Sequence, residues 1–434
     1  MQFRHLAVVL NRVTLPTMKF HEFFGRKASW LASLELFQYI GPGFFVTVGF
    51  IDPGNWVTNV TAGSQFGYQM LWVVTLSTVI LIIVQHNAAH LGIVTGLCLA
   101  EAASTFFQPW LRILMLGSAM LACIATALAE LLGAAIGLQM LFRLPLWLGT
   151  LLAACFSTWM LFSKNYQRLE KWIMGFVSLI GLAFVFELWL ADVAWGQVAQ
   201  GWIVPNIPAG SMTIIMGVLG AVVMPHNIFL HSEVIQSRQW NAKGDDVIKK
   251  QLKYEFMDTL TGMGVGWAIN SAMIIMAAAV FFVHGSTVTD LRQVTSTIEP
   301  IFGSLSAQVF ALGLLFAGLS SSVTAAMAGG SVFAGIYREP FDMADNHSRI
   351  GLAITLLGAT GVILVLRDPF KGIFWSQVAL SIQLPLTIIP LILLTSSERV
   401  MGGYANRLFT KLVLWLVGLL VIGLNLLLLK EALG

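Results

Sequence analysis

Long runs of apolar residues recur along the chain, separated by short polar stretches. The hydrocarbon core of a bilayer is about 30 Å thick and is spanned by about 20 apolar residues in a helix. Only helices and closed barrels satisfy every backbone polar group there, and these runs are too long for barrel strands. The pattern predicts an all-α integral membrane protein with eleven transmembrane helices, at about 39–66, 68–95, 109–139, 145–163, 169–192, 211–235, 254–284, 302–333, 349–366, 373–395 and 408–429.

The composition supports this prediction. Apolar residues make up 57% of the chain and charged residues 10%, whereas soluble domains carry about 25% charged residues. The net charge of +3 is small and scattered, which argues against a nucleic-acid partner. No linker-like tract interrupts the sequence, so we expect one transmembrane domain at 39–434, embedded in the lipid bilayer. The stretch 1–38 lacks a signal-peptide pattern and is expected to be a cytoplasmic N-terminal segment.

Positive charges are distributed unevenly between the two sets of predicted loops. If the N-terminus is cytoplasmic, 19 of the 24 Lys and Arg residues lie on the cytoplasmic side. The other five are Arg143, Arg292, Arg367, Lys371 and Lys430. The positive-inside rule therefore predicts a cytoplasmic N-terminus and, with eleven spans, an outside C-terminus. Short termini and loops without apparent glycosylation sites favour a bacterial inner (plasma) membrane.

Two of the predicted helices are interrupted near the middle of the membrane. The first contains Asp52-Pro53-Gly54-Asn55 within an otherwise apolar run. Proline removes a backbone donor, glycine adds freedom, and an ionised Asp at this depth costs several kcal/mol unless a partner compensates it. A bound cation is the expected partner of Asp52, and a structural ion pair is the weaker alternative.

The sixth predicted span is interrupted by a similar group of helix-breaking and polar residues. Met224-Pro225-His226-Asn227 repeats the x-Pro-x-Asn pattern of the first break, five helices later. Paired interrupted helices at matching positions indicate a midplane binding site between inverted repeats. We expect repeat one at about 39–192, repeat two at about 211–395, and an extra helix at about 408–429.

The side chains beside the two breaks suit a metal ion. Asp52 offers a charged oxygen, Asn55 a neutral oxygen and Met224 a soft sulfur. A thioether favours Mn²⁺, Fe²⁺, Co²⁺ or Cd²⁺ over Mg²⁺ or Ca²⁺, which prefer oxygen ligands. Methionine in a helix is more often a packing residue, but the position of Met224 beside the break favours a ligand role.

Several strings resemble the natural resistance-associated macrophage protein (Nramp) family of proton-coupled divalent metal importers, particularly its bacterial manganese transporters. They are IDPGN at the first break, LGIVTG at 91–96, LAE at 128–130, MPHNIFLHS at 224–232 and SQVALSIQLP at 376–385. The resemblance covers nearly the whole chain. It implies the inverted five-plus-five fold of the bacterial leucine transporter, with an eleventh helix added.

The resemblance also assigns roles to residues. It implies that the metal ligands are Asp52, Asn55, the Ala221 carbonyl and Met224, with Gln377 joining in some conformations. It places Glu130, His226 and His231 with Asp52 on a proton route and aligns Arg349 with an arginine pair of that route. A buried Glu and a His beside the site suit proton transfer on physical grounds as well. No nucleotide, haem or nucleophile motif is visible, so we expect a monomeric transporter without a cofactor, with the metal ion as its substrate.

The chain departs from the family along the proton route. Ala127 stands where relatives carry an aspartate, Met120 where they often carry another acid, and Ser348 precedes Arg349 where two arginines are usual. Two alternatives to a proton-coupled importer therefore stay open: a divalent cation carrier that is uncoupled or has a broader selectivity that includes Mg²⁺, and a membrane metal sensor that does not transport. An enzyme is not expected.

Three further polar residues have more than one interpretation. His86 and His90 share a helix face at i, i+4. They could be hydrated interface residues, metal ligands or members of a lateral proton route to water. Glu233 could line a solvated vestibule or take part in metal release or proton exit.

Overall fold

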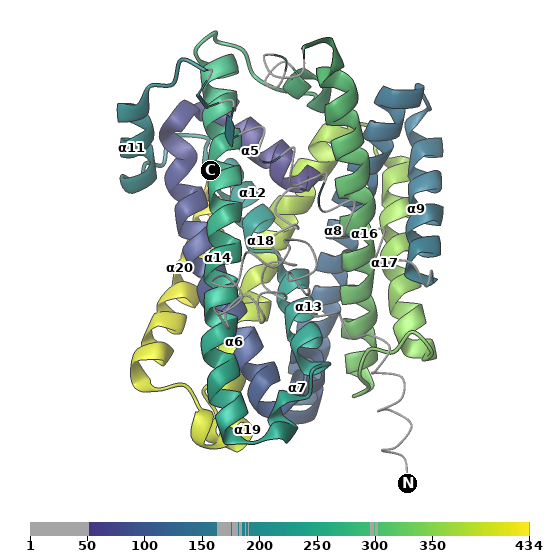
Figure 1. Ribbon diagram of the computed structural model, residues 1–434, viewed down its shortest axis with the longest axis vertical. Coiled ribbons are helices and arrows are strands. Elements are labelled where there is room, and N and C mark those ends of the chain that lie inside the picture. The colour runs from purple at the N-terminus through teal and green to yellow at the C-terminus, as the bar shows by residue number, and fades with distance from the viewer. Residues whose placement is uncertain are drawn as a thin grey trace, which may run out of the picture.

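The computed structural model describes residues 52–162, 191–295 and 303–433, together with residue 299 and a few isolated residues between 163 and 190. The secondary structure of these residues is helical throughout. Long helices stand side by side in one upright bundle, and shorter helices lie at its ends (Figure 1).

Most predicted spans have a helix in the described part of the chain. These helices are α5 (Pro53–Phe66), α6 (Leu71–Thr95), α8 (Pro109–Phe142), α9 (Leu146–Phe162), α12 (Met212–Val222), α13 (Pro225–Gln236), α14 (Asp245–Ala277), α16 (Ser306–Ile336), α17 (Asn346–Val365), α18 (Pro369–Thr395) and α20 (Leu408–Leu433). Eight helical stretches among the described residues are long and apolar enough to cross a membrane, and α9 is a shorter apolar helix. The predicted segment 1–38, the start of the first span and nearly all of the span at 169–192 lie outside the described residues, so the count of eleven stays a prediction.

Short helices connect the long ones. They are η3 (Gly67–Met70), α7 (Leu99–Phe106), α11 (Trp195–Ile203), η4 (Trp240–Lys243), the π-helical turn η5 (Ala278–Phe282), η6 (Leu291–Val294), η7 (Gly303–Leu305), α19 (Glu398–Met401) and η8 (Gly402–Tyr404). The sequence did not predict α7, which begins at a capping box in which Cys98 and Glu101 bond each other's backbone.

Apolar side chains cover the outside of the bundle. Leu357 on α17 is 71% exposed, Val365 is 80% exposed, and Leu416 on α20 is 66% exposed. Buried polar residues are concentrated inside the bundle instead, on α5, α6, α13, α14 and α18. This arrangement is the one that a lipid environment selects, because lipid tails solvate leucine but not unpaired polar groups.

The predicted break in the sixth span is present. α12 ends at Val222 and α13 begins at Pro225, while Met224 between them has extended backbone, with φ −69° and ψ 116°. At the other predicted break, α5 begins at Pro53, and Asp52 before it has extended backbone, with φ −105° and ψ 163°. The helix start in the first span is thus confirmed, while its preceding half lies outside the described residues.

α5 contacts α8, α12, α14 and α18 and crosses the upper part of the bundle in the view of Figure 1. Glycines allow the close approaches. A side chain at Gly133 of α8 would overlap the ring of Pro53, and one at Gly220 of α12 would overlap the backbone of Gln377 on α18. Packing through small residues therefore brings the two breaks and α18 together.

Candidate metal-binding site

Asp52 forms the first half of the site at the N-terminus of α5. Its carboxylate is buried, with only 1% of the residue exposed. One carboxylate oxygen accepts the backbone N–H of Asn55 at 2.6 Å, and the other accepts the Asn55 side-chain amide at 3.2 Å. The N-cap geometry and the positive end of the helix dipole hold this carboxylate in place.

Ala221 and Met224 form the second half, at the gap between α12 and α13. In a continuous helix the Ala221 carbonyl would accept the N–H of residue 225, but Pro225 has none. The carbonyl instead accepts the side-chain amide of Asn55 at 3.0 Å, which joins the two breaks directly. Met224 is buried, and its sulfur lies 3.4 Å from the amide nitrogen of Asn227.

Gln377 reaches the site from α18. Its side chain is buried and lies against Gly54, where a Cβ atom would come within 2.7 Å of the Gln377 Cδ atom. Its amide nitrogen donates to the Ser376 hydroxyl at 3.1 Å. Gln377 thus lies beside the first break, and a side chain at position 54 would displace its amide group.

The predicted ligands form a buried, mainly oxygen donor set. Hydrogen bonds join Asp52, Asn55 and Ala221, and Met224 lies in the same helix gap. The Oδ1 atom of Asn55 is buried without a hydrogen-bond partner in the described part of the chain. A buried acceptor of this kind is costly unless a ligand uses it. One carboxylate, one amide oxygen, one carbonyl and one thioether fit a divalent transition metal.

Two of the predicted proton-route residues lie on the α8 side of the site. Glu130 is 1% exposed, interacts electrostatically with Asp52, and leaves its Oε2 atom without a hydrogen-bond partner among the described residues. His226 lies 3.0 Å from the hydroxyl of Thr126, measured from its Nδ1 atom. Thr126 and Glu130 are one turn apart on α8. His226 therefore packs against the face of α8 that carries Glu130.

The other two predicted residues lie elsewhere. His231 faces α6 and α14, where its Nδ1 atom is 2.6 Å from the side-chain oxygen of Gln85. Arg349 is exposed at the start of α17 and donates to the Met343 carbonyl at 2.8 Å. The structure therefore brings Glu130 and His226 to the metal site, directs His231 to a second polar cluster, and does not bring Arg349 to either.

The sequence analysis missed Gln85 and Glu255 of that second cluster. Glu255 is buried on α14 beside His86 and His231. The sequence feature that could have indicated Glu255 is an acidic residue at the start of a predicted span, in the string QLKYEFMD. Farther along α14, the side-chain oxygen of Asn270 accepts from Asn59 of α5 at 2.5 Å, which is a hydrogen bond between two helices.

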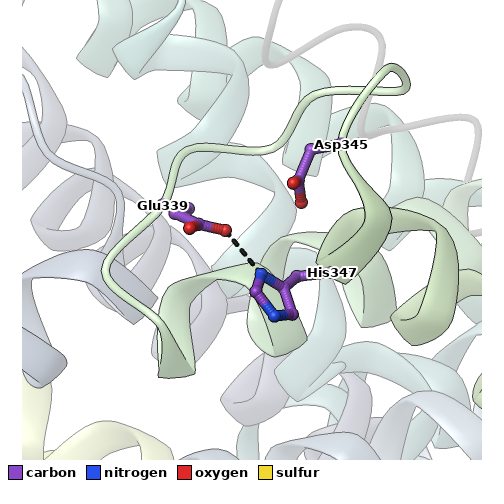
Figure 2. A group of neighbouring side chains, drawn as sticks. All are labelled: Glu339, Asp345 and His347. Atoms are coloured by element: carbon purple, nitrogen blue, oxygen red, sulfur yellow. Dashed lines mark hydrogen bonds and ion pairs between the residues drawn. The ribbon is translucent and has the colours of Figure 1, made fainter.

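A separate group of potential metal ligands lies in the connection between α16 and α17 (Figure 2). His347 is 2.7 Å from a carboxylate oxygen of Glu339 and stacks on Tyr337. Asp345 caps α17, and the N–H of Ser348 holds the pKa of the Asp345 carboxyl below its usual range. All three side chains are partly exposed. The contacts described above hold the loop in place and explain why these side chains lie together.

The fold and the buried donor set at paired helix breaks define a multi-pass membrane transporter. The chain belongs to the family described as natural resistance-associated macrophage protein-like, whose model matches residues 43–431. A protein named divalent metal cation transporter MntH from Caldanaerobacter subterraneus is 38% identical over 90% of this chain and 92% of its own. The MntH protein of Bacillus subtilis is 36% identical over 91% and 92%.

Solved structures agree with this membership. The manganese transporter of Eremococcus coleocola matches with a TM-score of 0.76 and 26% identity, over 93% of this chain and 88% of that chain. Mhp1, a nucleobase-cation-symport-1 family transporter, shares the fold with a TM-score of 0.60 and 16% identity, over 91% and 92%. The predicted fold class is confirmed, as is the prediction of a transporter rather than an enzyme. The repeat boundaries stay predictions.

Proposed function

We propose that this chain imports divalent transition-metal ions across the inner membrane, with Mn²⁺ as the preferred ion and Fe²⁺, Co²⁺ and Cd²⁺ as further substrates. The observation that carries the proposal is the buried carboxylate of Asp52, joined through Asn55 to the free carbonyl of Ala221. The names of the MntH relatives and of the Eremococcus coleocola manganese transporter support it.

The ligands can bind an ion without dismantling the site. A carboxylate has about four lone-pair positions, and Asp52 uses two of them on Asn55. The remaining positions, the unpaired Asn55 oxygen and the second lone pair of the Ala221 carbonyl can face the ion. The Met224 sulfur adds a preference for transition metals over Mg²⁺.

We infer transport by movement of the broken helices against their neighbours. Rotation of α5 or α13 about its break changes which face of the site is open. The interrupted backbone provides the hinge, because its residues are not held by intrahelical hydrogen bonds. No nucleotide is required in this scheme.

Proton coupling is the second part of the proposal. Protons and a metal ion compete for the Asp52 carboxylate, which links metal binding to pH. Glu130 and His226 lie on the same side of the site and are the expected proton acceptors. Ala127 and Met120 are buried apolar residues on that helix and cannot accept a proton, which is the reason for keeping an uncoupled carrier as the alternative. A carrier of broader selectivity that includes Mg²⁺ is the other form of this alternative. A non-transporting metal sensor is a remote third alternative.

Reconstitution into liposomes tests the proposal. Mn²⁺ uptake and internal pH are measured together for the wild type, for Asp52→Ala and for the exposed control Glu398→Gln. We expect the wild type to take up Mn²⁺ with internal acidification. Loss of the charged ligand in Asp52→Ala should lower uptake by at least about tenfold, since metal ligands dominate the site's affinity, whereas Glu398→Gln should retain it.

The outcomes separate the alternatives. Mn²⁺ uptake without acidification would identify an uncoupled carrier. Specific Mn²⁺ binding without uptake would identify a sensor. Unchanged uptake in Asp52→Ala would refute the assigned site.

A further inference from the structure

Glu255 connects two histidines across three helices. Its Oε2 atom is 2.5 Å from Nδ1 of His86 on α6, and its Oε1 atom is 3.9 Å from Nε2 of His231 on α13. Thr259 on the same helix donates to Oε1 at 2.6 Å. Glu255 is 5% exposed and His231 is fully buried, whereas the side chain of His86 is 32% exposed. The three residues therefore run from the interior to the surface.

The cluster contains atoms whose hydrogen-bonding capacity is unused. Nε2 of His231 and Nε2 of Gln85 are both buried without a hydrogen-bond partner in the part of the chain that the structure describes. Nδ1 of His231 faces the oxygen of Gln85 at 2.6 Å and so carries a hydrogen in this arrangement. If the imidazole is neutral, Nε2 is then an acceptor facing a carboxyl oxygen. One proton between Nε2 and Oε1, directly or through a water, satisfies both atoms.

The opposite end of the cluster leads toward water. His90 lies one turn beyond His86 on α6 and interacts electrostatically with His86 and Glu255. His90 also lines a pocket of about 510 Å³ at this end of the bundle, together with Asp245, Lys249 and Arg407. These charged residues make the pocket a suitable acceptor of protons.

We propose that His231, Glu255 and His86 form a proton-transfer path from the interior of the bundle to the pocket lined by His90. The inference rests on the proton-coupled form of the proposed function. His231 lies about two turns beyond Met224 on α13, so the path starts near the metal site and runs along α6 and α14. The path does not use the α8 side, where the apolar side chains of Ala127 and Met120 cannot accept a proton.

Each transfer conserves charge and atoms. Protonated His231 gives its Nε2 proton to Oε1 of Glu255. The neutral carboxyl group then rotates about its Cγ–Cδ bond, so that the same proton faces Nδ1 of His86 and is transferred to it, and His86 releases its Nε2 proton to water. Rotation of the carboxylate back, and exchange of the His86 tautomer through water, reset the path. The next proton from the interior restores His231. His90, Arg238 and Asp258 are the other charged or titratable groups around the path: His90 interacts with Glu255, and Arg238 with His231 and Asp258.

The path is tested by the number of protons moved per Mn²⁺ ion in proteoliposomes. His86→Gln and Glu255→Gln keep hydrogen-bonding groups of similar size but cannot pass a proton at pH 7. We expect each to lower the proton-to-Mn²⁺ ratio by at least about tenfold, within the range of lost acid–base groups. Mn²⁺ uptake down its own gradient should stay within about threefold of wild type.

Two matched variants sharpen the result. Glu233→Gln removes a carboxyl group on α13 that accepts from Ser331 and offers a competing exit. His347→Gln removes a partly exposed histidine in the α16–α17 connection. Both should keep the wild-type ratio.

The path is wrong if both His86→Gln and Glu255→Gln keep the wild-type ratio, or if Glu233→Gln lowers it as much. Should Glu255→Gln fail to insert, His86→Gln decides, because its side chain is partly exposed. A wild type that takes up Mn²⁺ without acidification overturns the path but leaves metal transport intact. A wild type without uptake overturns the proposed function itself.

Discussion

In the proposed site, Met224 is the residue that we expect to favour transition metals over alkaline-earth ions. The other proposed ligands are oxygen atoms, which Mg²⁺ and Mn²⁺ both accept. The buried thioether gains little from Mg²⁺, and it replaces an oxygen or a water that Mg²⁺ would keep. We therefore expect the selectivity of the proposed site to depend on one sulfur atom.

Replacing Met224 by alanine should remove this selectivity. We expect Met224→Ala to weaken Mn²⁺ and Cd²⁺ affinity by roughly tenfold, because a contact to the metal ion is lost. We also expect uptake to become sensitive to Mg²⁺. Competition of excess Mg²⁺ with Mn²⁺ uptake measures both effects. Met263→Ala, which truncates a buried methionine on α14, is the control and should keep Mg²⁺ resistance. Equal Mg²⁺ sensitivity in the two variants would assign Met224 to packing.

The candidate metal ligands can be recognised in the sequence, whereas the second polar cluster cannot. Asp52 and Met224 stand beside prolines in apolar runs, so their unusual chemistry is visible locally. The contact of Glu255 with His86 joins residues 169 positions apart, and no local pattern specifies that pairing. His86 and His90 were recognised as candidates for a lateral proton route, but their acidic partner became apparent only in the packed helices.

At the scale of helices, the apolar runs predicted which segments of the described chain are helical. They predicted the first and last residues of these helices less accurately. The span expected at 109–139 is α8, Pro109–Phe142, and the span expected at 408–429 is α20, Leu408–Leu433. α14 begins at Asp245, earlier than the expected 254, because its first turns are polar and leave no apolar signal. α7 was missed because eight residues are too few to show a helical period.

Contact between α5 and α8 sets the position of Asp52. Gly133 of α8 touches the Pro53 ring, and a methyl group there would overlap it. Gly133→Ala should push the first turn of α5 away from α8. Overpacking costs about 1–3 kcal/mol, so we expect a lower unfolding temperature in detergent and roughly tenfold weaker Mn²⁺ binding.

Gly117→Ala is the matched control for this prediction. Gly117 lies on the same helix, and no atom is close enough to contact an added methyl group. Alanine should raise helix stability there by up to about 1 kcal/mol. If both variants bind Mn²⁺ like the wild type, the α5–α8 contact does not position the site.

At the scale of the whole molecule, charge asymmetry determines the expected orientation. The regions that carry most Lys and Arg residues include the α13–α14 connection, with Arg238 and Lys243, and the start of α14, with Lys249. The same end of the bundle contains the pocket lined by His90. We infer that this end faces the cytoplasm, so that protons and metal ions leave there.

Cysteine labelling tests the orientation. Thr289 and Glu398 are exposed and belong to connections that we assign to opposite sides. In a background of Cys98→Ser, Cys123→Ala and Cys155→Ala, an impermeant maleimide added to intact cells should label Thr289→Cys and not Glu398→Cys. Serine at position 98 keeps an acceptor for the α7 cap, where Glu101 N–H meets the Cys98 sulfur at 3.5 Å.

Permeabilised cells provide the control, in which both cysteines should react. The reverse pattern in intact cells would place the His90 pocket outside. In that case the path through His231, Glu255 and His86 would deliver protons to the site rather than release them from it. The labelling result therefore gives the direction of proton movement along the proposed path as well as the sidedness of the chain, because the pocket lined by His90 marks the end of α6 where the path meets water.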